Sequence, residues 1–148
     1  MKVTAFNGSP RKNGNTSQLL GIVSEVLAEH DIETDIVDIA RQPIAGCTAC
    51  MACAENKNGA CIQDGDPVNE WIRKAVDSDG LILASPTYFA NVSAQMKAFI
   101  DRVGFVARVN GDLFEKKVGA AVLAVRRGGA VPAFEPEKWE SDEQYRKE

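Results

Sequence analysis

The order of strand-like and helix-like segments is the feature that most limits what this chain can fold into. Several strand segments are almost wholly apolar, which is typical of parallel strands that are covered on both faces. The sequence therefore predicts an α/β fold with helices on both faces of a doubly wound parallel sheet. Strand patterns fall at residues 2–6, 32–39, 81–84 and 118–125, and helical periodicity falls at residues 15–27, 66–76 and 93–106.

Sheets of this kind bind ligands at the carboxyl ends of their strands. Residues 8–17, 85–92 and 126–130 follow three of the strands, so we expect these segments to converge at that edge. The loops at 29–32 and 107–117 show no features of a binding site, and we expect them at the opposite edge. His30, the only histidine, falls in the first of them, so we expect no Ser-His-Asp or Cys-His mechanism.

The first of the three converging segments has the composition of an anion-binding loop. It combines hydroxyl groups, two glycines and two basic residues just before a helix, whose N-terminus attracts negative charge. Hydroxyls of Ser9, Thr16 and Ser17 and the guanidinium of Arg11 can bind phosphate oxygens. A polar turn that only caps the helix, with Asn15 or Thr16 as N-cap, explains the same residues.

The second segment places an aromatic pair, Tyr88 and Phe89, among small polar residues. Aromatic rings can cover the faces of a flat heteroaromatic ligand while polar groups meet its rim. The alternative is an ordinary connection with both rings packed into the core.

Together these two loops resemble the flavodoxin-like NAD(P)H-dependent FMN reductase family. The resemblance covers roughly residues 1–130 and is carried by residues 8–11, 14–16 and 85–91, with 94–102 behind them. It implies a three-layer α/β/α sandwich with strand order 2-1-3-4. It implies that the FMN phosphate is held by Ser9, Arg11, Asn13, Asn15, Thr16 and Ser17. It implies that the isoalloxazine and ribityl groups are lined by Pro86, Thr87, Tyr88, Phe89 and Asn91. It also suggests that the pyrimidine end of the flavin is reached by Arg126, Arg127, Gly128 and Gly129, which alone would be read equally well as a solvated basic turn.

All four cysteines, Cys47, Cys50, Cys53 and Cys61, lie in a stretch from 40 to 65 in which no secondary structure is expected. Clustering favours a metal, cluster or redox role over structural disulfides. A CxxCxxC run is typical of [4Fe–4S] ligation, whereas structural zinc more often uses two separated CxxC pairs. Thiols without a metal, able to form a redox-active pair, are the third possibility. The arrangement resembles the iron–sulfur flavoproteins, which pair FMN with a [4Fe–4S] cluster.

The resemblance implies an enzyme, an NAD(P)H-dependent flavin oxidoreductase. In such an enzyme the flavin carries the reaction, so we expect no catalytic side chain. NAD(P)H would reduce FMN, and electrons would then pass through the cluster to an electron-carrier protein or another acceptor. A cluster-free NAD(P)H-dependent FMN, quinone or nitro reductase is the first alternative. A flavodoxin-like electron-transfer protein without enzymatic activity is the second. The resemblance also implies a homodimer or homotetramer.

Composition excludes other classes of protein. Outside residues 135–148, which carry six acidic and three basic residues, the chain is close to neutral, so we expect no nucleic-acid partner. The longest apolar run, 119–125, is far shorter than a membrane span, and no signal peptide is evident. We therefore expect a cytoplasmic protein without a membrane partner.

We expect residues 1–134 to form one flavodoxin-like FMN-binding domain, with the cysteine loop 40–65 inserted, and residues 135–148 to form a charged tail. Flavodoxin-like folds have five strands, and the pattern contains four. We therefore expect either that the chain is incomplete or that a neighbouring subunit covers the exposed edge of the sheet. Trp139 and Tyr145 are candidate docking anchors in the tail.

Overall fold

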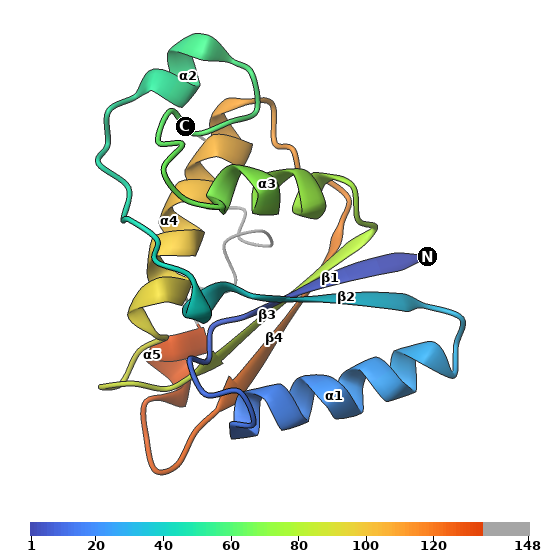
Figure 1. The fold of residues 1–148 in the computed structure, drawn as a ribbon. Helices are drawn as coiled ribbons and strands as arrows, with labels where there is room; N and C mark the ends of the chain where they lie inside the picture. The colour runs from blue at the N-terminus through green and yellow to red at the C-terminus, as the bar shows by residue number, and fades with distance from the viewer. Residues whose placement is uncertain (135–148) are drawn as a thin grey trace.

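A four-stranded parallel sheet forms the centre of the molecule (Figure 1). The structure is a computed structural model that describes residues 1–134; the charged tail, with Trp139 and Tyr145, lies outside the described residues. The strands are β1 (Lys2–Asn7), β2 (Glu33–Asp38), β3 (Gly80–Pro86) and β4 (Val118–Ala124). Their order is β2-β1-β3-β4 and every pairing is parallel, as predicted for a flavodoxin-like fold.

Helices cover both faces of this sheet. Figure 1 shows α1 (Asn15–Ala28) on one face and α3 (Val68–Val76) with α4 (Ala94–Val109) on the other. Three short helices complete the described chain: η1 (Ile39–Arg41), α2 (Ala52–Asn56) and α5 (Ala130–Phe134). The expectation that residues 40–65 lack secondary structure is therefore wrong, because α2 lies inside that range.

Two helix starts also differ from the prediction. Gly14 is the N-cap of α1, in place of Asn15 or Thr16, and no side chain caps this helix. Pro67, expected in the first turn of its helix, is instead the N-cap of α3. Sequence patterns locate a helix start only to within a few residues, since several neighbouring residue types are compatible with a cap.

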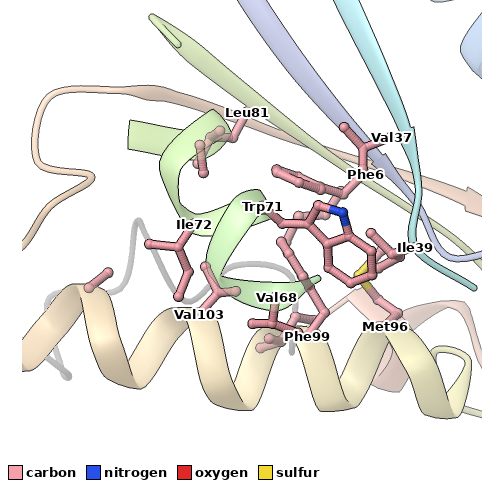
Figure 2. Close-up of a cluster of buried hydrophobic side chains, with 14 of the residues drawn as sticks. Phe6, Val37, Ile39, Val68, Trp71, Ile72, Leu81, Met96, Phe99 and Val103 are labelled. Carbon is pink, nitrogen blue, oxygen red and sulfur yellow. The ribbon is translucent and has the colours of Figure 1, made fainter. Parts of the chain in front are cut away.

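The core has two layers because side chains alternate along the central strand β1. Val3 and Ala5 pack with Leu20 of α1, whereas Phe6 faces the opposite layer. Figure 2 shows that layer, in which Phe6 lies among side chains of α3 and α4. The ring centroid of Phe99 lies 4.5 Å from that of Phe6. This layer fixes α4 against the sheet, and α4 borders both parts of the site described below.

β4 is an edge strand. Its first residue, Val118, is 69% exposed, and no other described strand pairs with its outer edge. An apolar strand with one open edge agrees with the expectation of an exposed sheet edge. None of the described helices is long and apolar enough to cross a membrane.

Candidate functional site

Three loops meet at the carboxyl edge of the sheet, as predicted. The hydroxyl of Ser93 donates a hydrogen bond to the Gly8 carbonyl oxygen at 2.7 Å and so joins the loop after β1 to the loop after β3. Gly129, in the loop after β4, lies against Ala90 so closely that a Cβ at Gly129 would be 2.6 Å from the Ala90 Cα. Segments far apart in the sequence therefore form one surface at this edge.

The loop after β1 ends at a helix N-terminus that is open to an anion. α1 begins after Gly14, and because no side chain caps it, its first backbone N–H groups have no partner within the helix. A Cβ at Gly14 would lie 3.1 Å from the Ser9 Oγ, so a side chain at this position would crowd Ser9. Ser9 and Thr16 are buried beside this turn, and Arg11 is exposed. The helix dipole and these groups make the loop a suitable phosphate cradle.

Asn7 organises this loop, and the sequence analysis missed it. Its Oδ1 accepts the Ser9 N–H at 3.0 Å, and its Nδ2 donates to the Ser17 Oγ at 3.0 Å and to the Asp38 Oδ1 at 2.8 Å. The Ser17 hydroxyl also donates to the Arg11 carbonyl at 3.4 Å. Ser17 therefore shapes the loop from within, while the exposed side chains of Asn13 and Asn15 border it. A polar residue ending a buried strand was the available signal for Asn7.

The loop after β3 is a strained tight turn with an aromatic tip. The N–H of Tyr88 donates to the Asn91 carbonyl at 2.8 Å, and the N–H of Asn91 donates back at 3.1 Å. Between them, Phe89 and Ala90 have φ angles of 47° and 61°, which non-glycine residues rarely adopt. Phe89 is fully exposed and Tyr88 is 42% exposed, so the alternative that both rings pack into the core is wrong.

Thr87 precedes this turn and carries an unsatisfied hydroxyl. Its Oγ1 is buried and has no hydrogen-bond partner among the described residues. A buried polar atom without a partner costs about 1–3 kcal/mol, so a ligand that gave this hydroxyl a hydrogen bond would remove that cost. This orphaned atom, the exposed rings and the open helix N-terminus fit the heteroaromatic and phosphate groups of FMN.

The loop after β4 adds positive charge to the same edge. Arg126 and Arg127 are exposed and form no ion pair with described residues. Gly128 is exposed as well, and Gly129, with a φ of 90°, packs against Thr87 and Ala90. Both guanidinium groups are therefore free to meet an anionic part of a ligand.

The four cysteines line a single hollow, together with Arg102, Phe105 and Val106 of α4. Cys53 is buried in α2, Cys61 is half-buried, and Cys47 and Cys50 are exposed; all four are free thiols. The N–H of Ala49 donates to the Cys47 sulfur at 3.4 Å.

The surroundings of Cys53 show how the thiols affect one another. Burial raises the pKa of the Cys53 thiol, and the neighbouring thiols of Cys61 and Cys50 raise it further, more than backbone N–H groups lower it. Among the described residues, no three cysteine, histidine or acidic side chains are already close enough to hold a metal ion. The donor set nevertheless fits a four-cysteine centre in kind, because all four cysteines line one hollow.

The segment 107–117, expected to be uneventful, holds the cysteine loop in place. Asn110 accepts the Gly59 N–H at 2.9 Å and donates to the Cys53 carbonyl at 3.3 Å. Lys57 also donates to the Val109 carbonyl. α2, which carries Cys53, therefore lies beside the C-terminal half of α4, away from the three converging loops at the N-terminus of α4 (Figure 1).

Comparison with known proteins places the chain in a family. The profile of the NADPH-dependent FMN reductase family matches residues 1–136, so the chain belongs to that family. It is 41% identical over 131 residues to an iron–sulfur flavoprotein of Methanosarcina thermophila, covering 87% of this chain and 66% of that protein. It is 39% identical over 136 residues to an iron–sulfur flavoprotein of Methanocaldococcus jannaschii, covering 87% and 65%. Within the family the chain therefore falls in the iron–sulfur flavoprotein subgroup, and it spans about two thirds of the length of these relatives.

A solved structure confirms the fold. The crystal structure of RosB with bound 8-demethyl-8-formylriboflavin-5'-phosphate matches 90% of this chain and 55% of its own, with a TM-score of 0.71 and 16% sequence identity. At that identity the likeness concerns the flavodoxin-like architecture.

Proposed function

We propose that this protein is an FMN-dependent oxidoreductase that takes electrons from NAD(P)H. Electrons would leave through a [4Fe–4S] cluster to an electron-carrier protein or another acceptor. The convergence of three loops at one sheet edge, beside an uncapped helix N-terminus, is the observation that carries the proposal. We assign this role to residues 1–134 as one domain, with the cysteine loop 40–65 inserted in it.

In this proposal the loop after β1 binds the FMN phosphate. Free N–H groups in the first turn of α1 would donate to phosphate oxygens, and the Arg11 guanidinium would neutralise part of their charge. Ser9 and Thr16 lie buried at the base of the cradle, where a bound oxygen would be shielded from water. The full set that we assign to the phosphate is Ser9, Arg11, Asn13, Asn15, Thr16 and Ser17.

The other two loops would hold the flavin ring and ribityl chain. Bound FMN supplies hydride acceptance from NAD(P)H and release of electrons one at a time. The Thr87 hydroxyl would gain the hydrogen bond that it lacks, and Tyr88 and Phe89 would cover the ring. The ring site comprises Pro86, Thr87, Tyr88, Phe89 and Asn91, with Arg126, Arg127, Gly128 and Gly129 at the pyrimidine end. The positive charges of Arg126 and Arg127 would stabilise negative charge on the flavin ring.

Cys47, Cys50, Cys53 and Cys61 would bind the [4Fe–4S] cluster, which supplies one-electron storage. Clustered free cysteines fit a reducing compartment, so the proposal includes a cytoplasmic location. It also includes a homodimer or homotetramer, which light scattering after size-exclusion chromatography would test.

Anaerobic purification followed by cofactor analysis tests the proposal. We expect bound FMN and, after reconstitution, about four iron and four sulfide per chain. Cys61→Ser should lower the iron content, whereas Thr48→Ala, at an exposed position between two cysteines, should not. Stopped-flow mixing with NADH or NADPH should bleach the flavin.

Each other outcome identifies an alternative. FMN without iron would indicate a cluster-free reductase, and bound FMN that neither nucleotide bleaches would indicate an electron carrier. Failure to bind FMN would overturn the whole proposal.

A further inference from the structure

Arg102 is a buried cation at the cysteine hollow. Its side chain is 0% exposed, and it is the largest of the fully buried side chains in the described part of the chain. Burial of a charge is costly unless the charged group is paired and hydrogen-bonded. The partners of Arg102 therefore show what its burial achieves.

The guanidinium holds both ends of the cysteine segment. One terminal nitrogen pairs with Asp66 and donates to the Ala45 carbonyl at 3.3 Å, and the other donates to the Gln63 carbonyl at 2.9 Å. Ala45 lies two residues before the first cysteine, and Gln63 lies two residues after the last. Arg102 thus closes the loop that carries the four sulfurs.

One donor of the guanidinium is left over. The Nε of Arg102 is buried and has no hydrogen-bond partner among the described residues, although the side chain lines the hollow with all four cysteines. Burial alone lowers the pKa of Arg102, but hydrogen bonding to Asp66 and the proximity of the Cys61 sulfur outweigh burial and raise it. Asp66 therefore occupies one side of the guanidinium, and Cys61 lies close to the group.

We propose that Arg102 is a positioning residue for the cysteine centre, and that its Nε–H donates a hydrogen bond to a cluster-bound cysteine sulfur, that of Cys61 first. This inference rests on the proposed function. Adding one electron makes the cluster and its four thiolates more negative by one charge, so an N–H donor directed at a sulfur favours the reduced state. Hydrogen bonds to sulfur are among the factors that set cluster potentials.

The test compares Arg102→Lys with Arg108→Lys, the same substitution further along α4 at a half-buried arginine outside the hollow. Lysine keeps a charge that can pair with Asp66 but has no Nε–H. Iron, sulfide and FMN are measured after anaerobic reconstitution, and the cluster potential is measured by a mediator titration with dithionite. We expect Arg102→Lys to lower the equilibrium constant for reduction at least tenfold, which is about 59 mV for a one-electron couple. Arg108→Lys should leave the potential unchanged.

An Arg102→Lys protein that carries full iron and has an unchanged potential would overturn the inference. If this variant fails to hold the cluster, the wild-type protein labelled with ¹⁵N-arginine tests the hydrogen bond directly. Pulsed EPR of its reduced cluster should show coupling to an arginine nitrogen, and absence of coupling would refute the hydrogen bond. Wild-type protein that binds no iron would instead overturn the proposed cluster, and this inference with it.

Discussion

An Asp66→Asn substitution should destabilise the fold by about 3–5 kcal/mol, because it leaves Arg102 charged and buried without a counter-ion. The Asp66 side chain is only 8% exposed. Its carboxylate accepts hydrogen bonds from Arg102 and from the N–H groups of Ala45 and Val68, both at 3.2 Å. Asparagine has nearly the same shape but only one acceptor oxygen, so at least one of these donors would face an NH₂ group.

The pH dependence of stability gives a second readout of the same pair. Burial alone would raise the pKa of Asp66, but bonding to Arg102, Ala45 and Val68 outweighs burial and lowers it from 3.8. A depressed folded-state pKa contributes stability that is present above pH 3.8 and is lost as the pH falls further. The difference in unfolding free energy between wild type and Asp66→Asn should therefore be greatest near neutral pH and should shrink below pH 3.8.

Urea unfolding followed by circular dichroism measures this effect. With a urea dependence of about 2 kcal/mol/M, the midpoint should fall by about 1.5–2.5 M. Asp101→Asn is the matched control, because its pair with Lys97 is on the same helix but exposed, with side chains 42% and 48% accessible. The unfolding free energy of Asp101→Asn should fall by less than about 0.5 kcal/mol. A loss under about 1 kcal/mol for Asp66→Asn, or equal losses for both variants, would refute the reasoning.

Three further substitutions test the carboxyl edge. Ser93→Ala removes the N-cap of α4 and the bond to Gly8, so urea unfolding should show a loss of about 1–2 kcal/mol. Thr87→Val removes an unpaired hydroxyl, so the stability of the FMN-free protein should hold or rise, while fluorescence titration should show about tenfold weaker FMN binding. Gly129→Ala introduces a Cβ against the neighbouring loop and should weaken FMN binding by a similar factor, whereas Gly21→Ala, in α1 with open space around it, should not. Equal affinities for the two glycine variants, or weaker folding of Thr87→Val, would contradict these expectations.

The sheet could be predicted because its signals are local and repeated. Residues 81–84 are apolar at every position, and all are buried in β3. Parallel strands place their carboxyl ends at one edge, so the three converging loops followed from the strand assignments alone. α2 and α5 were not predicted, since helices of five residues are too short to show a hydrophobic period.

Other features depend on contacts between distant parts of the chain. Phenylalanine and alanine do not indicate positive φ angles, so the conformation of Phe89 and Ala90 could not be predicted; glycine or asparagine would have suggested it. Asn110 was assigned to an uneventful loop, because its bonds to Gly59 and to the Cys53 carbonyl span more than fifty residues. Such contacts leave no periodic trace in the sequence.

The burial of Arg102, by contrast, is indicated by its position in the helical pattern of the sequence. Phe99, Val103 and Val106 mark the buried face of α4, and a charged residue at position 102 falls on that same face. A charge among apolar positions implies a buried partner, here Asp66. The partner could not be identified from the sequence, since several acidic residues were available and only the fold selects one.

α4 connects the two parts of the candidate site. Ser93 at its N-cap holds the phosphate and ring loops together, and Arg102, nine residues later, closes the cysteine loop. At 1.5 Å per residue these positions are about 14 Å apart along the helix axis. Because one helix carries both, its packing against Phe6 and Trp71 fixes the position of the cysteine loop relative to the flavin loops. A change that tilts α4 should therefore disturb flavin and cluster binding together, whereas a change at Thr87 or at Arg102 should disturb only one of them.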